Sequence, residues 1–301
     1  MRRFLLAATA ILVLAAPALA APGDFALEDV RFLSSDALKG RGIGTDASLD
    51  AQLYILMRMR ELKLEPVGQE FTFKKKNGTE VAGVNLMAKI AGTQPGGKAI
   101  VVTAHYDHLG VVGGQIYNGA DDNASGVAAL LAVAEAFKGR TPKHDVWIVF
   151  LDGEESGLRG ARAFVETPPV PLASIALNIN FDMLSKNAKG ELYAAGGSAS
   201  PWVKAQLEAL VPAAPAILRL GHDTGPADSF DNWTYQSDHG AFARAGVAWV
   251  YFGVEDHPEY HKPTDDFVTI PQAFFRKAVD TVVLATRRFD DQLDSLETRA
   301  P

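Results

Sequence analysis

Apolar runs and amphipathic segments alternate along most of this chain. Several short runs are almost wholly apolar, as in strands that are buried on both faces of a sheet. These runs lie at 99–104, 146–151, 175–181 and 247–252. Two further strands are predicted at 70–74 and 81–90, with Asn77-Gly78 as the hairpin turn between them.

Helices are predicted between and after these strands. In the segment 49–64, apolar residues recur at helical spacing, which predicts an amphipathic helix. Those apolar residues are Leu49, Leu53, Leu56, Met57 and Met59. Further helices are predicted at 29–38, 125–137 and 271–293. Buried strands that alternate with helices are typical of the α/β class. We therefore predict one domain with a mostly parallel (mixed) central β-sheet and helices on both faces.

The first 20 residues have the pattern of an export signal. Arginines at positions 2 and 3 precede an uncharged apolar stretch at 4–16, and Ala-Leu-Ala at 18–20 fits a small-x-small cleavage site. The apolar stretch is shorter than the roughly 20 residues that a membrane span needs. We therefore expect a signal peptide at 1–20, a mature domain at 21–301, and an exported protein that is periplasmic or extracellular. No stable membrane insertion is expected after signal cleavage.

Composition and charge exclude several classes of protein. The chain has no cysteine, so a disulfide scaffold is excluded, and its 48% hydrophobic and 22% charged residues are ordinary for a globular domain. The formal net charge of −7 argues against a nucleic-acid partner, because phosphate binding needs clustered Lys and Arg.

Histidines and carboxylates follow the ends of the predicted strands. In open α/β sheets, ligand sites lie beyond the carboxyl ends of the strands. The segments concerned are 105–108, 119–123, 152–157, 182 and 260–265. Each has an ordinary explanation by itself, such as helix capping by Asp and Asn. Together at one edge they indicate a metal site, and imidazole and carboxylate ligands suit zinc, cobalt or manganese.

The motifs AHYDHLG, GADDNASG, DGEESGLRG, NFDM and YHKPTDD, in this order, resemble those of the di-zinc aminopeptidases of peptidase family twenty-eight in clan MH. The stretch FLSSDALKGRGIGT also looks like the exported bacterial members of that family. The resemblance covers essentially the whole mature chain. It implies a zinc-exopeptidase (phosphorylase/hydrolase-like) architecture for the catalytic domain at 21–301.

The resemblance also implies a ligand set for two Zn2+ ions, with cobalt or manganese as possible substitutes. His105 and Asp182 correspond to ligands of one zinc. Glu155 and His261 correspond to ligands of the other zinc. Asp122 corresponds to the carboxylate that bridges the two metals.

Three further residues correspond to catalytic groups of the family. Glu154 matches the general base, which takes a proton from a metal-activated water and delivers it to the leaving amine. Asp107 is expected to hold His105 in the right tautomer. Tyr260 is expected to donate to the developing oxyanion. The resemblance thus implies an exported zinc-dependent aminopeptidase that hydrolyses N-terminal residues from peptides with a free N-terminus.

Several assignments have alternatives. His108 is interpreted as a surface or rim residue. His257 lies four residues before His261, a spacing that could bind metal on a helix, but Pro258 disfavours a helix there. Asp238 is interpreted as the cap of the following helix, with shaping of the pocket as the alternative.

A loop with His222 and Asp223 is a candidate wall of the substrate cleft.

Other functions on the same fold also stay open at this stage. A glutaminyl cyclase or a carboxypeptidase could use this architecture, and a binding domain could have kept the fold and lost the metals. The complete set of ligand positions favours the two-metal hydrolase.

Overall fold

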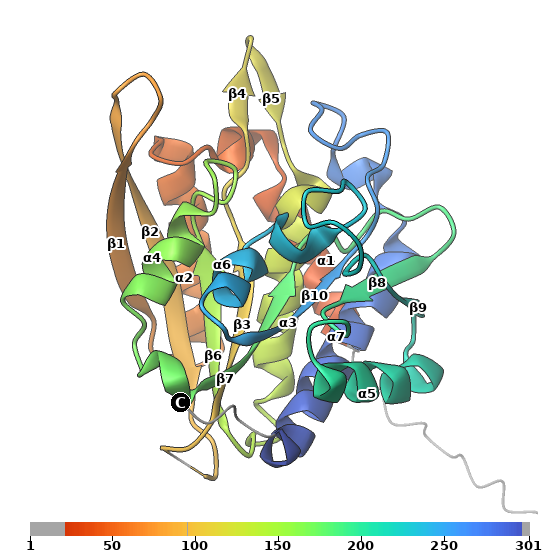
Figure 1. Cartoon of the computed structure of the whole chain (residues 1–301). Helices are drawn as coiled ribbons and strands as arrows, with labels where there is room; N and C mark the ends of the chain where they lie inside the picture. The colour runs from red at the N-terminus through yellow and green to blue at the C-terminus, as the bar shows by residue number, and fades with distance from the viewer. Residues whose placement is uncertain (1–21, 95, 297–301) are drawn as a thin grey trace, which may run out of the picture.

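The computed structural model describes residues 22–94 and 96–296, in which an eight-stranded mixed sheet lies between two layers of helices (Figure 1). The predicted signal peptide at 1–20 lies outside the described residues. The strands are β1 (Val67–Lys74), β2 (Glu80–Ile90), β3 (Ala99–His105), β4 (Gly110–Val112), β5 (Gln115–Tyr117), β6 (Asp145–Leu151), β7 (Ile175–Phe181), β8 (Glu191–Ala195), β9 (Ile217–Leu220) and β10 (Ala248–Gly253).

The large sheet has the strand order β1-β2-β6-β3-β7-β10-β8-β9. Its centre, from β6 through β3 and β7 to β10, is parallel. The strands β1, β2 and β8 join their inner neighbours in antiparallel fashion, and β9 runs parallel to β8. The short strands β4 and β5 form a separate hairpin that projects beyond the sheet (Figure 1). The predicted mixed sheet is confirmed, and the carboxyl ends of its four central strands meet at one edge.

Two helical layers cover this sheet. The helices are α1 (Pro22–Leu33), α2 (Asp46–Glu61), α3 (Gly126–Ala136), α4 (Arg159–Glu166), α5 (Pro201–Leu210), α6 (His239–Arg244) and α7 (Gln272–Gln292). Of these, α1, α3 and α7 pack together in the larger core cluster, whereas α4 and α6 pack in a second cluster on the other face. A π-helical turn, Ala120–Ser125, leads into α3, and 3-10 turns such as Asp36–Arg41 and Trp233–Tyr235 occur in the loops.

Alternation along the central strands explains why they are wholly apolar. In β6, Val146, Ile148 and Phe150 pack in the larger cluster, while Trp147, Val149 and Leu151 pack in the smaller one. Side chains of a strand point alternately to its two faces, and both faces here carry helices. The prediction of strands that are buried on both faces is therefore confirmed.

The helix α2 forms as predicted but buries a different face. Ala51, Ile55 and Met59 are buried, whereas Leu53 is 64% exposed, and Leu49 and Met57 are also exposed. Thr45 caps the helix, since its side chain accepts a hydrogen bond from the backbone N–H of Ser48 at 3.2 Å. Of the predicted apolar residues, Met59 and half-buried Leu56 pack in the core, whereas Leu49, Leu53 and Met57 do not.

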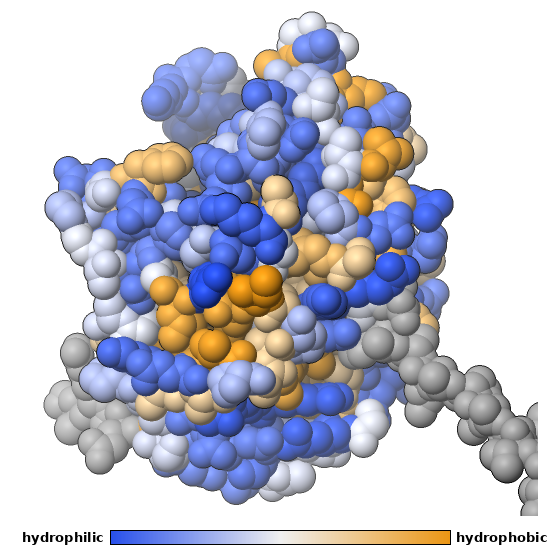
Figure 2. Space-filling view, turned by 90° about the vertical axis from the view of Figure 1, so that its right-hand side faces the viewer, coloured by the Kyte–Doolittle hydropathy of each residue, from blue (hydrophilic) through white to orange (hydrophobic). Residues whose placement is uncertain are grey.

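On the face of the molecule that carries β8, β9 and α5, hydrophilic residues surround a central apolar area, and smaller apolar patches lie toward the upper right (Figure 2). Ile217 and Leu220 of the edge strand β9 are 51% and 39% exposed. No helix within 22–94 or 96–296 combines the length and the apolar character that crossing a membrane requires.

Buried Arg41 joins the loops at the carboxyl edge of the sheet. Its guanidinium donates to the backbone carbonyl oxygens of Leu33, Tyr106, Asn118 and Gly119 at 2.6–3.0 Å. Two of these acceptors lie in the segments that carry the candidate residues after β3 and before α3. Burial lowers the pKa of Arg41 to about 10, so the side chain keeps its charge at neutral pH.

Replacing Arg41 with Met is expected to lower the free energy of unfolding by about 3 kcal/mol or more, because four buried carbonyl groups lose their donor. Urea denaturation measures the loss, with the exposed Arg60→Met as the matched control. A change for Arg41→Met no larger than that for Arg60→Met would show that the four contacts contribute nothing to stability.

Candidate metal centre

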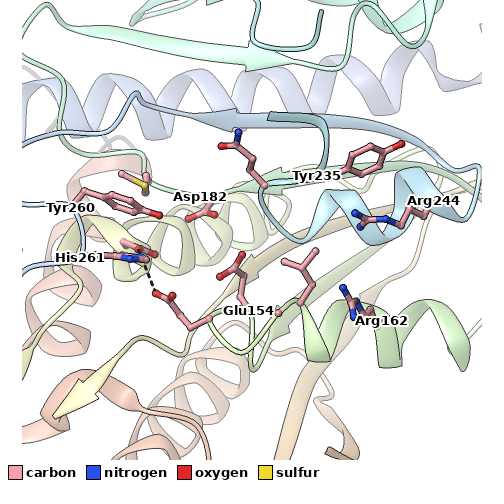
Figure 3. A pocket seen from close by; sticks show the side chains of 13 residues that line it. Glu154, Arg162, Asp182, Tyr235, Arg244, Tyr260 and His261 are labelled. Carbon is pink, nitrogen blue, oxygen red and sulfur yellow. Dashed lines mark ion pairs between the residues drawn. The ribbon is translucent and has the colours of Figure 1, made fainter. Parts of the chain in front are cut away.

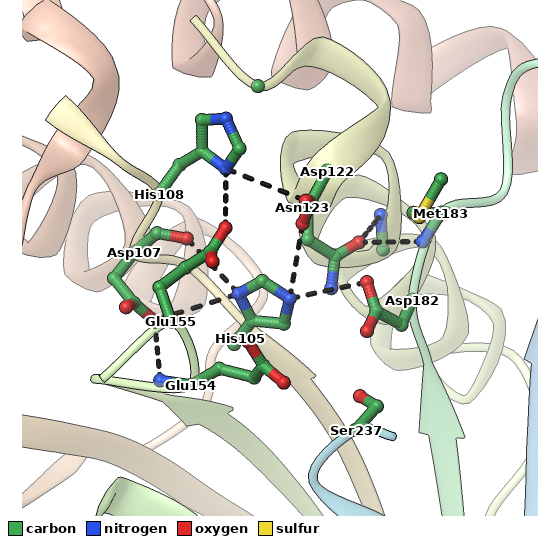
Figure 4. Close-up of polar contacts among 12 residues, drawn as sticks. His105, Asp107, His108, Asp122, Asn123, Glu154, Glu155, Asp182, Met183 and Ser237 are labelled. Atoms are coloured by element: carbon green, nitrogen blue, oxygen red, sulfur yellow. Dashed lines mark hydrogen bonds and ion pairs between the residues drawn. The ribbon is translucent and has the colours of Figure 1, made fainter. Parts of the chain in front are cut away.

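The ends of β3 and β7 bring His105 and Asp182 together. His105 is the last residue of β3, and Asp182 directly follows β7. The Nε2 atom of His105 lies 3.2 Å from Asp182 Oδ1 and 3.5 Å from Asp122 Oδ1. These three residues are buried, and each offers a ligand atom within 4.8 Å of the others (Figure 4). Their arrangement fits one cation.

A second group of the same kind is formed by His108, Asp122 and Glu155. The Nδ1 atom of His108 lies 2.8 Å from Glu155 Oε1 and 3.7 Å from Asp122 Oδ2. The Nε2 atom of His261 also approaches these two oxygens, at 3.5 and 3.0 Å. Asp122 thus belongs to both groups: its Oδ1 faces His105, and its Oδ2 faces the second set.

The interpretation of His108 as a surface or rim residue is wrong. Its side chain is fully buried and is directed at Glu155 (Figure 4). Sequence reasoning missed it because Glu155 lies 47 positions away and only the fold brings the two together. The available signal was its place, three residues after His105 at the end of β3.

The donor set fits divalent cations. The Oε1 atom of Glu155 and both ring nitrogens of His108 are buried, and the contact between the two residues lacks hydrogen-bond geometry. Burial, together with the charge of Glu155, raises the pKa of Asp122 to about 6. Burial also raises the pKa of Glu155, but the nearby imidazoles of His108 and His261 outweigh this effect and hold that pKa well below its usual range. The negative charge of such crowded carboxylates is offset when cations bind between them.

Glu154 lies beside the ligands but belongs to neither group. Its backbone N–H donates to Asp107 Oδ1 at 3.1 Å, which fixes the loop after β6 against the loop after β3. Burial raises the pKa of Glu154 well above its ordinary value, with Asp238 and Asp182 adding to the rise against the opposing effect of His105. A carboxylate with a raised pKa is a stronger proton acceptor.

Asp107 contacts His105 mainly through its backbone. The carbonyl oxygen of Asp107 lies 3.1 Å from His105 Nδ1, and its carboxylate oxygen lies 3.6 Å away. A carbonyl only accepts, so Nδ1 carries the hydrogen and Nε2 keeps its lone pair for a metal.

Tyr260 stacks on His261, with a ring-centroid distance of 4.0 Å. Burial and nearby carboxylates, Asp122 first among them, raise its pKa, so its hydroxyl stays protonated and able to donate. It lines the same pocket as Glu154 (Figure 3).

A second layer of charges holds the turn that carries Asp122. The carboxylate of Asp265 accepts the backbone N–H groups of Asp121 and Asp122 at 3.1 Å and pairs with buried Lys186 at 2.7 Å. His257 lies 2.9 Å from Asp121 Oδ2. His257 therefore supports the turn, and it belongs to neither candidate ligand group.

The interpretation of Asp238 as the cap of α6 is wrong. Asp238 makes no side-chain cap of α6; both its carboxylate oxygens are buried without a hydrogen-bond partner among the described residues, and burial raises its pKa to about 8. The ring of His222 stacks on that of Trp233, with a centroid distance of 3.7 Å. The carboxylate of Asp223 accepts a hydrogen bond from the backbone N–H of Gly196. Neither His222 nor Asp223 lines the pocket at the candidate metal centre.

The pocket over this centre has a volume of about 370 Å³, within the usual range for ligand sites. Its lining includes Asp122, Glu155, Asp182 and His261. Leu158, Met183 and Tyr235 form other parts of its wall. The pocket gives a ligand access to the residues between the strand ends.

Comparison with known proteins gives the family. The model of Peptidase family M28 matches residues 85–286. The Bacillus subtilis protein "Aminopeptidase YwaD" is 27% identical over 198 residues, which cover 62% of this chain and 40% of that protein. The chain spans less than half the length of the curated relatives that it matches first.

Solved structures share the fold. A zinc aminopeptidase from Bacillus subtilis matches with a TM-score of 0.72 at 18% identity, covering 88% of this chain and 94% of that one. Porphyromonas gingivalis glutaminyl cyclase matches with a TM-score of 0.71 at 20% identity, covering 90% and 98%. With more than half of its residues inside the family match, and with that family's fold around its candidate metal centre, the chain belongs to Peptidase family M28.

Proposed function

We propose that this chain is an exported, zinc-dependent aminopeptidase that binds two zinc ions and removes N-terminal residues from peptides. The observation that carries the proposal is the position of Asp122, whose two carboxylate oxygens face two separate ligand groups. The similarity to zinc aminopeptidases supports the choice of metal and reaction.

His105 and Asp182 would hold one ion, Glu155 and His261 the other, and Asp122 both. His108 is a further candidate ligand at the second ion, since it contacts Glu155 at 2.8 Å. When bound, the two cations supply Lewis acidity that polarises a carbonyl and lowers the pKa of water. Together they also offset about four negative charges, the number carried by Asp122, Glu154, Glu155 and Asp182 when all are ionised.

The remaining chemistry is assigned to this chain's own groups. Glu154 accepts the proton of the attacking water and returns it to the leaving amine. Tyr260 donates its hydroxyl hydrogen to the oxygen on which negative charge develops. Asp107 holds both His105 and the backbone of Glu154, so it positions a ligand and the base together.

A glutaminyl cyclase reaction is the second candidate, because a cyclase shares the fold at a TM-score of 0.71. That reaction closes the N-terminal glutaminyl residue on itself and needs no attacking water. Incubation of a zinc-loaded protein with a peptide that begins with glutamine separates the two candidates. Release of glutamine supports the aminopeptidase, whereas loss of ammonia from an uncleaved peptide supports the cyclase.

Acetylation of the N-terminus is expected to abolish cleavage of a good hexapeptide substrate, because an aminopeptidase requires the free amine. Amidation of the C-terminus of the same hexapeptide is expected to leave the rate unchanged. Chromatography of the products with zinc-loaded protein measures both. Cleavage of the acetylated peptide together with protection by the amide would identify a carboxypeptidase instead.

The proposed location is the periplasm or the medium. Fractionation of cells that produce the full chain, followed by N-terminal sequencing, tests this part. A mature protein that starts at Ala21 in the exported fraction supports it, and an intact N-terminus in the cytoplasm contradicts it.

A further inference from the structure

Two arginines line the pocket away from the candidate metal ligands. Arg162 belongs to α4 and Arg244 to α6, and both contribute to the same pocket wall as Glu154 (Figure 3). In that view Tyr260 and His261 lie on one side of Glu154, and the two arginines lie on the other. The candidate metal ligands therefore lie at one end of the pocket, and the two arginines lie at the other.

Neither guanidinium is neutralised by a carboxylate. Within 22–94 and 96–296, the side chain of Arg162 makes no hydrogen bond or ion pair. Arg244 donates one hydrogen bond, to the carbonyl oxygen of Gly240 at 3.3 Å, and lies over the ring of Tyr235 at 4.2 Å. Each guanidinium has five N–H donors. Most of these donors are free to bind a ligand.

The helices that carry these arginines are fixed against each other. Phe164 of α4 and Phe242 of α6 are buried, and their ring centroids are 5.5 Å apart. The stacking on Tyr235 also restricts the side chain of Arg244, so this side chain loses less conformational entropy when it binds a ligand.

The charge balance of the pocket also favours a negatively charged ligand. Its lining includes four carboxylates and these two arginines, and it includes no lysine. Once two divalent cations offset the four carboxylates, the arginines leave the cavity positive. A planar carboxylate is the group that a guanidinium binds best, with two parallel hydrogen bonds.

We propose that Arg162 and Arg244 bind a carboxylate of the peptide substrate and give the enzyme a preference for acidic peptides. The inference rests on the proposed peptidase function and deepens it. The carboxylate belongs to an acidic side chain next to the cleaved bond, or to the C-terminus of a dipeptide, whose short length brings that end into the pocket.

Matched substrates test this with the zinc-loaded protein. Amidated hexapeptides carry Glu or Gln at the first position in one pair and at the second position in another. A dipeptide and its amide form the third pair. The carboxylate-bearing member of at least one pair is expected to have a kcat/KM about ten- to a hundredfold higher, the size of a charge-assisted contact. The pair that shows the preference identifies the source of the carboxylate.

Variants connect the preference to the arginines. The double variant Arg162→Gln/Arg244→Gln is expected to lose the preference, so that within each pair the kcat/KM of the carboxylate-bearing member falls to that of the neutral member. Arg162→Glu/Arg244→Glu is expected to favour the neutral members and substrates with Lys. The exposed Arg60 of α2 lies outside the pocket, so Arg60→Gln serves as the matched control and keeps the preference.

The outcomes separate the two levels of the proposal. If the wild type cleaves neutral peptides without favouring any carboxylate, or if the preference survives in the double variant, the arginine assignment is overturned and the peptidase function stands. If no member of any pair is cleaved, the proposed function fails, and the substrate preference fails with it.

Discussion

Replacing Asp122 with Ala is expected to reduce the metal content of the purified protein from two ions per chain to none. Asp122 is shared by both ligand groups, through Oδ1 on the side of His105 and Oδ2 on the side of His261. Without it, each ion keeps only ligands from one side. Metal analysis after dialysis against zinc measures the content.

The same variant is expected to lose the stabilisation that zinc gives. A ligand at about 100 times its dissociation constant stabilises the native state by about 2.7 kcal/mol per site. Metal-free Asp122→Ala should be no less stable than the metal-free wild type, because a buried carboxylate with a raised pKa is removed. Thermal unfolding with and without zinc therefore distinguishes lost binding from a damaged fold.

Single-site variants serve as controls for this stoichiometry. His105→Ala should remove mainly one ion and leave the other. His108→Ala and His261→Ala both act on the second ion, and the variant with the larger loss identifies the stronger ligand there. A wild type that holds a single ion at saturating zinc would contradict the two-metal centre and favour the glutaminyl cyclase reaction.

The sequence was sufficient where one physical requirement dominated. Runs such as 146–151 must be strands because they are buried by helices on both sides, and this burial is visible as an unbroken apolar stretch. The predicted ligands converge because the central strands are parallel and therefore place their carboxyl ends at one edge of the sheet. The structure brings His105, Asp122, Glu155, Asp182 and His261 into two adjoining groups.

Features that depend on packing between distant segments were not predictable. The strands β8 and β9 are short, and β9 is largely exposed, so neither has a clear apolar pattern. The stripe of Leu49, Leu53 and Met57 is apolar yet exposed, and no local rule reveals this. His108 and Asp238 are polar residues in loops, and their burial follows only from what the fold places over them.

The adjacent pair Glu154 and Glu155 shows how the fold gives two neighbours different environments. Glu155 contacts two histidines, whereas Glu154 is held through its backbone by Asp107 and has carboxylates as neighbours. Their pKa values are shifted in opposite directions, downward for Glu155 and upward for Glu154. One is suited to bind a cation and the other to accept a proton.

Replacing Glu154 with Gln is therefore expected to lower kcat by about 100- to 10,000-fold, the usual contribution of a general acid–base group. This equals about 2.7 to 5.5 kcal/mol of transition-state stabilisation at 1.36 kcal/mol per decade. Gln has nearly the same size but cannot accept the proton of water. KM, metal content and the unfolding temperature should stay close to the wild-type values, because Glu154 is not needed as a ligand.

Glu155→Ala is the matched contrast, and it should lose metal and zinc-dependent stability together with activity. Steady-state kinetics, metal analysis and thermal unfolding on both variants give the comparison. Near-normal turnover in Glu154→Gln would remove it as the base, and loss of metal in that variant would make it a ligand. If the two variants exchanged their behaviour, the correspondence with the family motif would be displaced by one residue. The contact of Glu155 with His108 at 2.8 Å, which Glu154 lacks, argues against that displacement.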